Sequence, residues 1–182
     1  MNREETLATI RSAPRNIGRV VLVVRRPAVG EREVVTEAIL DPRVGMIGDS
    51  WSTRPSRHTP DRSPCRDMQV TLMCSRVAAA VAGPIARWPL AGDQLYVDLD
   101  LSAAALPTGT RLRVGTAVVE VTEIPHLGCA KFAARFGKDA LRFVNAKVHR
   151  PLRLRGINTR VVMGGVVRPG DVVQVVATTA TA

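Results

Sequence analysis

The stretch RLRVGTAVVEVTE, residues 111–123, carries the clearest signal of fold class in the chain. Residues 111–114 and 117–123 are rich in apolar and β-branched side chains, and Gly115 lies between the two runs. Two short runs of this kind around a glycine are typical of a β-hairpin. We therefore predict a pair of adjacent strands here.

Similar short runs occur on both sides of this hairpin. We predict strands at residues 19–25, 33–40, 68–73, 157–163 and 172–176, and a half-exposed strand at residues 95–101, where apolar and acidic residues alternate. Short helices are expected at residues 4–11 (weakly anchored), from a cap at Ser75 to Gly83, and at residues 129–136 and 138–145. Residues 50–66 contain three prolines and are predicted to form a long loop. The pattern indicates a mainly β domain with a few short helices, in a barrel or sandwich.

The length and composition fit one globular domain. The chain has 182 residues, of which 46% are hydrophobic. We assign residues 1–16 to an N-terminal extension, 17–177 to the domain and 178–182 to a flexible tail. No apolar run reaches the roughly 20 residues of a membrane span, and the first residues lack the apolar segment of a secretory signal. Three cysteines make no disulfide framework, which together with the missing signal favours the cytoplasm. Because no apolar run is long enough to span a membrane, we expect no membrane partner.

Positive charge is concentrated in one segment. The formal net charge is +10, and residues 131–160 alone hold nine basic residues and one acid, a net of +8. Such a cluster raises the local concentration of anions, although a solvated basic face gives the same pattern.

Cys129 stands at the start of this basic segment. It follows a predicted strand and turn and begins a predicted helix, with His126 three residues before it and Lys131 and Arg135 on one face of the helix after it. Neighbouring cations and a helix start favour the thiolate, which acts as a nucleophile, a sulfur carrier or a ligand to a soft metal. The alternative is a small buried hydrophobic residue. We expect Cys65 to be an exposed thiol and Cys74 to lie in the core.

Other kinds of site find less support in the sequence. The histidines, His58, His126 and His149, and the cysteines show no paired spacing of a structural zinc site. Gly164 and Gly165 lack the lysine of a phosphate-binding loop. We expect no pyridoxal phosphate.

Several motifs in order along residues 17–176 resemble those of the MOSC domain, the C-terminal domain of molybdenum cofactor sulfurases, in its stand-alone bacterial type. They are GMIGD at residues 45–49 followed by His58, MQVTL at 68–72, AGDQLY at 91–96, GTRLRVG at 109–115, CAK at 129–131 and RGI at 155–157 with RPGD at 168–171.

This resemblance implies a β-barrel-like fold and a role with the molybdenum cofactor (molybdopterin) or in sulfur transfer. It implies that Cys129 carries sulfur or coordinates molybdenum, and that His58, Asp49 and Gln94 contribute to the site. The cofactor is an anionic phosphorylated pterin, and basic side chains hold phosphate by charge-assisted hydrogen bonds. The candidates for that role are Lys131, Arg135, Arg142, Arg153 and Arg155. The alternative for His58 is a loop histidine whose hydrogen bonds are made to neighbouring residues. His149 contacts either an anion or solvent.

Three functions follow. The first is a molybdenum-dependent oxidoreductase component that needs a partner reductase, because the sequence has no flavin, haem or iron–sulfur motif. The second is a sulfur carrier or cofactor chaperone with a persulfide on Cys129, supplied by a sulfurtransferase partner. The third is a basic barrel that binds nucleic acid. Aromatic residues make up only 3% of the chain, and Phe132, Phe136 and Phe143 have the spacing of a buried helix stripe, which opposes this third function.

Overall fold

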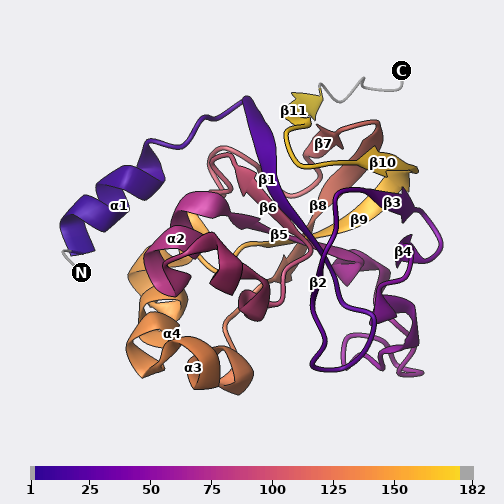
Figure 1. Ribbon diagram of the computed structural model, residues 1–182, viewed down its shortest axis with the longest axis horizontal. Helices are drawn as coiled ribbons and strands as arrows, with labels where there is room; N and C mark the ends of the chain where they lie inside the picture. The colour runs from indigo at the N-terminus through magenta and orange to yellow at the C-terminus, as the bar shows by residue number, and fades with distance from the viewer. Residues whose placement is uncertain (1–2, 177–182) are drawn as a thin grey trace.

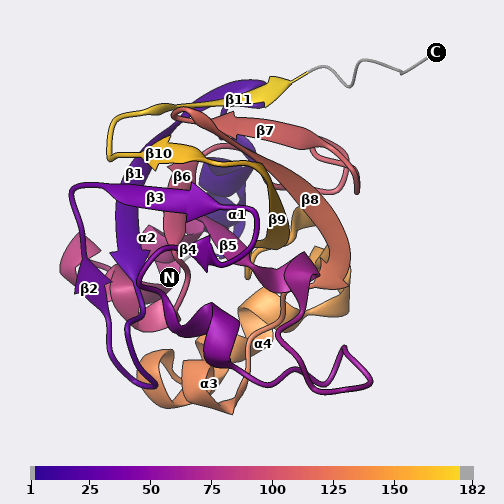
Figure 2. The ribbon, with the colours of Figure 1, turned by 90° about the vertical axis from the view of Figure 1, so that its right-hand side faces the viewer.

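Seven strands close into a barrel in the computed structural model, which describes residues 3–176 (Figure 2). The strand order is β11-β7-β8-β9-β5-β6-β1, and pairing of β1 with β11 closes the ring. All neighbouring pairs are antiparallel except β5 and β6, which are parallel. The barrel strands are β1 (Ile17–Arg25), β5 (Val70–Cys74), β6 (Leu95–Asp98), β7 (Arg111–Val114), β8 (Ala117–Pro125), β9 (Ile157–Met163) and β11 (Val172–Val176). The predicted mainly β fold with a barrel is confirmed.

Four short strands lie outside this ring. β2 (Glu33–Val34) extends the sheet beside β1, and β10 (Gly165–Val167), β3 (Ala38–Asp41) and β4 (Gly45–Met46) form a separate sheet of three strands. The prediction of one strand over residues 33–40 was therefore wrong. Its two ends pair with different sheets, because the chain leaves β1 after Val34 and pairs with β10 from Ala38.

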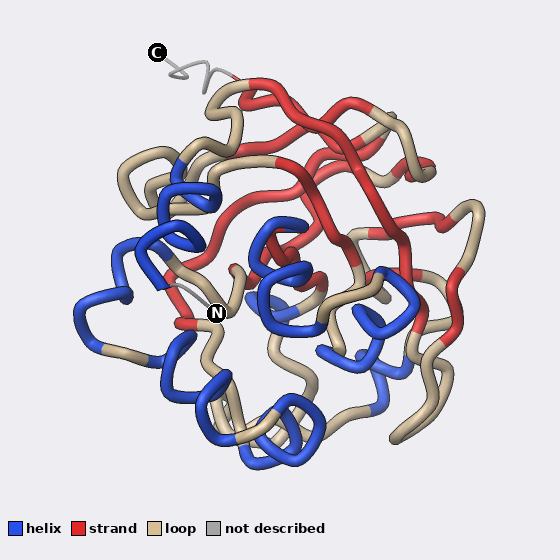
Figure 3. Tube along the Cα trace, turned by 60° about the vertical axis from the view of Figure 1, so that its left-hand side comes forward, coloured by secondary structure: helices blue, strands red, loops and turns tan. Residues whose placement is uncertain are grey.

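The helices gather toward one end of the barrel, as the separation of blue and red segments in Figure 3 shows. In Figures 1 and 2, helices α3 and α4 and the long segment after β4 lie at the same end. The α-helices are α1 (Arg3–Arg11), α2 (Ser75–Ala82), α3 (Ala130–Phe136) and α4 (Lys138–Asn145), and the 3₁₀ helices are η1 (Ser50–Thr53), η2 (Arg66–Met68), η3 (Ile85–Ala91) and η4 (Lys147–Leu152). Both ends of the predicted helix at residues 138–145 are confirmed.

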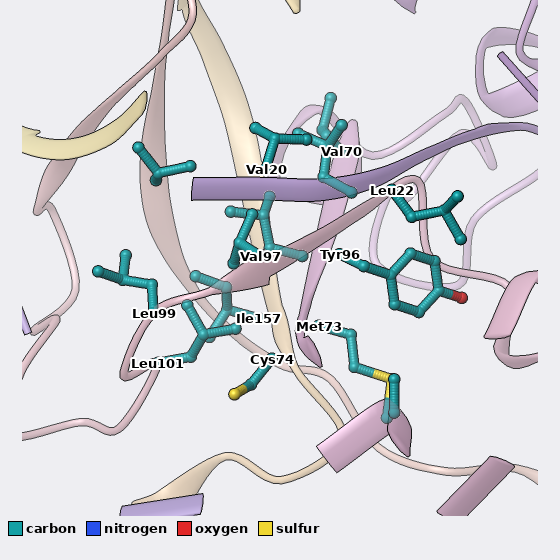
Figure 4. Packing of buried hydrophobic residues seen from close by; sticks show 14 of the residues in the cluster. Val20, Leu22, Val70, Met73, Cys74, Tyr96, Val97, Leu99, Leu101 and Ile157 are labelled. Carbon is teal, nitrogen blue, oxygen red and sulfur yellow. The ribbon is translucent and has the colours of Figure 1, made fainter. Parts of the chain in front are cut away.

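The core fills the barrel and the space between its wall and α2. Figure 4 shows Val20 of β1 close to Val97 of β6, and Tyr96 of β6 on the other side, beside Leu22 of β1. The prediction that residues 95–101 form a half-exposed strand was wrong, because β6 ends at Asp98 and the side chains of Leu95, Tyr96 and Val97 are fully buried. β6 lies between two barrel strands, with α2 packed against it, so both of its faces are covered.

Three smaller expectations need correction. Ser75 is the first residue of α2, and Cys74 occupies the cap position before it. Cys65 is buried, with Trp51 Nε1 donating to its carbonyl oxygen at 3.2 Å, whereas Cys74 lies in the core as expected. The N-terminal helix is anchored, since its Ile10 is buried and α1 packs against α2. The predicted tail at residues 178–182 lies outside the described residues.

Gly18 allows the barrel to close. At this point β1 pairs with β11, through Val173, while its other side runs against β6. A Cβ atom at Gly18 would come within 2.1 Å of the carbonyl oxygen of Asp98, which is backbone and cannot move aside easily. The ring therefore needs a residue without a side chain here.

We predict that Gly18→Ala lowers the free energy of unfolding by about 3 kcal/mol, at the upper end of the usual cost of overpacking. The control is Gly30→Ala in an exposed turn, where nothing lies within 4 Å and only the backbone conformation, with φ of +92°, is strained, at a cost of about 1 kcal/mol. Chemical denaturation of both variants measures the difference. Equal losses would contradict a steric role for Gly18.

Candidate functional site

Cys129 lies at the helical end of the barrel. β8 ends at Pro125, a three-residue connection follows, and Cys129 occupies the cap position before α3 with an extended backbone conformation. Its side chain is exposed, unlike those of Cys65 and Cys74. Of the three thiols in the chain, Cys129 is therefore the one that a ligand or partner reaches without rearrangement of the core.

The connection before Cys129 is fixed by α4. The Gly128 N–H donates to Asn145 Oδ1 at 2.8 Å, and Asn145 Nδ2 donates back to the Gly128 carbonyl at 2.9 Å. A Cβ atom at Gly128 would come within 2.7 Å of Leu141 Cδ1. The backbone that carries Cys129 is thus held by a two-way hydrogen bond and by close packing. No pattern in the sequence indicated the role of Asn145.

The segment from Leu90 to Asp93, which joins η3 to β6, gathers arginines from three other parts of the chain. The carbonyl oxygen of Leu90 accepts from Arg135 at 2.6 Å, that of Ala91 from Arg155 at 2.7 Å and that of Gly92 from Arg26 at 3.0 Å. These carbonyls orient the three guanidinium groups. Arg155 and Arg26 also pair with the carboxylates of Asp93 and Asp49, so among the described residues Arg135 is left without a carboxylate partner.

Asp93 forms a buried ion pair with Arg155. Arg155 Nη1 lies 2.5 Å from Asp93 Oδ2, and both side chains are almost completely buried. The guanidinium also stacks over the ring of Phe132 in α3, 5.1 Å from the centroid, which is a cation–π contact. Arg155 thus joins the start of β9 to η3 and α3.

His126 is placed beside this ion pair. Its Nδ1 lies 3.4 Å from Asp93 Oδ1, and its side chain is 14% exposed. Burial, and then the positive charge of Arg155, lowers the pKa of His126 to about 3. The imidazole is therefore neutral at physiological pH, and neither its Nδ1 nor Asp93 Oδ1 has a hydrogen-bond partner among the described residues.

A hollow of about 520 Å³ lies next to α3, and we call it the cationic pocket. It is lined by Val29, Gly30, Arg32, Arg54, Lys131, Ala134 and Arg135. Burial and then the charges of Arg135, Arg26 and Arg54 lower the pKa of Arg32. Arg32 Nε is buried and has no hydrogen-bond partner among the described residues. Like charges held together in this way are unfavourable unless an anion joins them.

Two further hollows lie beside the cationic pocket. The central pocket, about 220 Å³, shares Arg54 with it and also contacts Trp51 and Cys65. The β8–β9 pocket, about 270 Å³, shares His126 and Asn158 with the central pocket. The three hollows therefore follow one another across the end of the barrel, and the connection that carries His126 and Cys129 runs beside them.

The structure brings together only part of the predicted site. Lys131 and Arg135 line the cationic pocket, and Arg153 lines the β8–β9 pocket. Arg142 is exposed and pairs with Asp139, and His58 lies in the exposed part of the long loop. Their roles toward a ligand stay predictions.

Two of the predicted residues have structural partners, and their roles toward a ligand also stay predictions. Asp49 is buried in an ion pair with Arg26 at 2.8 Å and also accepts from the N–H of Trp51. Gln94 is buried, accepts from the N–H and the hydroxyl of Thr71, and donates to the Gln69 carbonyl. All the polar atoms of these two side chains have partners within the protein, so both position the ends of β1, β5 and β6.

Sequence reasoning missed Arg26, Arg32, Arg54 and Asp93. The first three precede the basic segment by about 80 to 100 positions, so a charge count along the chain cannot group them with Lys131. The Arg25–Arg26 pair at the end of a predicted strand was the available signal.

The described part of the chain offers no cluster of three or more His, Cys, Asp or Glu side chains suited to a metal ion. No helix within residues 3–176 is long and apolar enough to cross a membrane. Phe132 and Phe143 are buried, so neither presents a face for base stacking.

The fold and the site together define the class of protein. It is a closed barrel of mostly antiparallel strands with an exposed cysteine and clustered arginines at its helical end. The model of the MOSC domain matches residues 76–174, more than half of the chain. The protein belongs to the MOSC domain family.

Solved structures share this fold. The YuaD protein from Bacillus subtilis is similar with a TM-score of 0.60 and 16% identity, over 87% of this chain and 95% of that one. YiiM from Escherichia coli has a TM-score of 0.55 and 19% identity, over 88% and 71%. YiiM from Geobacillus stearothermophilus has a TM-score of 0.53 and 18% identity, over 91% and 76%. No curated protein matches the chain.

We predict that Arg155→Gln lowers the free energy of unfolding by about 3–5 kcal/mol, because it leaves Asp93 buried without its counter-ion. Arg168→Gln is the control, since its partner Glu37 is 47% exposed and such pairs contribute at most about 1 kcal/mol. Urea denaturation of both variants makes the comparison. Similar small losses would show that the buried pair is not needed for stability.

The lowered pKa of His126 predicts a pH dependence of stability. Below pH 6.5 the unfolded chain binds a proton on His126 that the folded protein does not, so stability falls as pH falls from 6.5 toward 3. Relative to His126→Asn, the wild type should lose up to about 1.4 kcal/mol for each pH unit in this range. Denaturation curves at several pH values measure this difference, and a constant difference would contradict a neutral buried imidazole.

Proposed function

We propose that this MOSC protein binds the molybdenum cofactor and acts as an oxidoreductase component that receives electrons from a partner reductase. In this proposal Cys129 supplies the thiolate ligand to molybdenum. The observation that carries the proposal is the cationic pocket, in which Arg32, Arg54 and Lys131 converge beside the segment that begins at Cys129.

The residues present suit such a cofactor. It carries a phosphate at one end and a pair of sulfur atoms that hold molybdenum at the other. The buried, unpartnered Nε of Arg32 and the mutual repulsion of its neighbours are relieved when a phosphate binds between them. The sulfur of an exposed cysteine is a soft ligand, which suits a metal already bound by sulfur.

Each group then has a separate task. Arg32, Arg54, Lys131 and Arg135 hold the phosphate, and Arg26, fixed by Asp49 and the Gly92 carbonyl, adds positive charge behind them. The hydrogen bonds between Gly128 and Asn145 keep the backbone of Cys129 in place for the metal. When bound, molybdenum supplies a centre that exchanges two electrons with a substrate.

A sulfur carrier or cofactor chaperone is the second candidate. The exposure of Cys129 favours it, because a persulfide must be handed over between proteins at an accessible thiol. Lys131, two residues away, adds a cation that stabilises the negative charge of the persulfide.

The location and domain limits belong to the same proposal. We place the protein in the cytoplasm, and the three free cysteines are in keeping with a reducing compartment. We take residues 17–177 as the MOSC domain and residues 1–16 as an extension that packs against it through Ile10.

The test is the molybdenum and pterin content of protein purified from a host that makes the cofactor. We predict near-stoichiometric metal and pterin in the wild type and loss of most of the metal in Cys129→Ala. Replacement of two phosphate-binding charges, as in Arg32→Gln with Arg54→Gln, should weaken retention of the pterin at least tenfold, because each charge-assisted hydrogen bond contributes about 1.5–3 kcal/mol. The surface variant Arg168→Gln should retain both.

Absence of both metal and pterin from the wild type would overturn the cofactor-binding proposal. A persulfide assay on Cys129 then tests the second candidate. Wild-type levels of pterin in the Arg32→Gln, Arg54→Gln protein would show that the phosphate lies elsewhere.

A further inference from the structure

The β8–β9 pocket has an apolar interior that the proposed cofactor site does not use. It lies between the last residues of β8 and the segment that leads from η4 into β9, and its volume is about 270 Å³. That space is large enough for a small organic molecule, whereas a cofactor of two joined ring systems and a phosphate needs a larger volume. The apolar residues that line it are Ile124, Pro125, Leu127, Val144, Leu154 and Ile157.

Two arginines are the cations of this pocket. Arg153 is half-buried, and its Nη1 donates to the Leu106 carbonyl at 2.6 Å. Its backbone adopts a left-handed conformation, with φ of +48°, which is unusual for a residue with a side chain. Arg150 is exposed on the same wall. A carbonyl oxygen orients the Arg153 guanidinium without neutralising it, and burial lowers its pKa.

The other ionisable groups of the pocket leave this charge in place. Arg155 is neutralised by Asp93, and His126 is uncharged. Glu123 lies at the rim with an exposed side chain. Arg153 is thus the half-buried charge for which an anionic ligand offers a partner.

The inner wall of the pocket contains polar atoms without partners. Asn158 is 1% exposed and donates through Nδ2 to the Ile124 carbonyl at 3.0 Å, but its Oδ1 has no hydrogen-bond partner among the described residues. The same holds for Nε of Arg155. Buried polar atoms without a partner cost about 1–3 kcal/mol each, so a ligand or water at this wall is favoured.

We propose that the β8–β9 pocket binds a small molecule with an apolar ring and a carboxylate, and that Arg153 holds the carboxylate. The ring lies against Ile124 and Ile157. Because His126 and Asn158 separate this pocket from the central pocket, such a ligand is positioned as the substrate of the neighbouring cofactor. Only this last step rests on the proposed function, since the binding itself needs the protein alone.

The experiment uses the full chain prepared without cofactor, with benzoate as the probe and benzamide as its uncharged counterpart. Benzoate is titrated while the backbone amide signals are followed by NMR. We expect benzoate to shift the signals of residues 124–127 and 153–158, with a dissociation constant below about 10 mM. Benzamide should bind at least tenfold more weakly, because it lacks the charge that pairs with Arg153.

Two variants with a control make the assignment. Arg153→Gln should weaken benzoate binding at least tenfold. Leu127→Trp, at an exposed position of the rim, should block the pocket and abolish the shifts without disturbing the core. Arg168→Gln should bind like the wild type. Thermal unfolding of each variant checks that it is folded.

Three outcomes would overturn the proposal. They are no shifts at benzoate concentrations up to about 50 mM, equal binding of benzamide, and shifts confined to the cationic pocket around Arg32 and Arg54. The titration is independent of metal and pterin content. A negative benzoate titration therefore does not contradict the cofactor proposal. Absence of metal and pterin likewise does not contradict ligand binding in the β8–β9 pocket.

Discussion

The organisation of the site depends on the buried ion pair between Asp93 and Arg155. Charges in the interior are costly to desolvate, and such a pair is retained only when further hydrogen bonds satisfy its members. Arg155 meets it in part, through a hydrogen bond to the Ala91 carbonyl and the ring of Phe132, whereas its Nε and Asp93 Oδ1 have no hydrogen-bond partner among the described residues. The same contacts fix η3, the start of β9 and α3 against one another. Residues of α3 line the cationic pocket, and residues of β9 line the other two hollows.

A second constraint follows from how the remaining arginines are held. Arg26, Arg135 and Arg153 donate to carbonyl oxygens, which set their directions but leave their charges uncompensated, apart from that of Arg26 beside Asp49. An arrangement that served stability alone would place carboxylates among these groups. The accumulation of positive charge on the side of α3 that follows the exposed Cys129 is the feature on which the proposed cofactor site rests.

The sequence predicted the barrel and the position of Cys129 because these depend on local patterns. Short β-branched runs with glycine and proline between them identify strands. A cysteine between a predicted strand and a predicted helix can be recognised as a candidate site residue. The same reasoning failed for residues 95–101, where the acidic side chain of Asp98 pairs with Arg76 at the end of β6 and gave the false appearance of a half-exposed strand. It failed for Cys65, because Trp51 covers this part of a polar loop.

Only two of the four basic residues of the cationic pocket could be predicted from the sequence. Lys131 and Arg135 stand next to Cys129, but Arg32 and Arg54 come from the connections after β1 and η1 and reach α3 only when the barrel is closed. Asp49 and Gln94 show the reverse case, in which the sequence predicts a site residue and the structure shows partners within the protein. Their motifs drew attention to them as site residues, whereas the folded protein uses every one of their polar atoms internally.

The most direct test of this account is a crystal structure of the cofactor-loaded protein, with diffraction data collected on both sides of the molybdenum absorption edge. The account predicts one anomalous peak next to Sγ of Cys129 and phosphate density in contact with Arg32 and Arg54. A molybdenum peak away from Cys129, or a phosphate bound outside the cationic pocket, would contradict it.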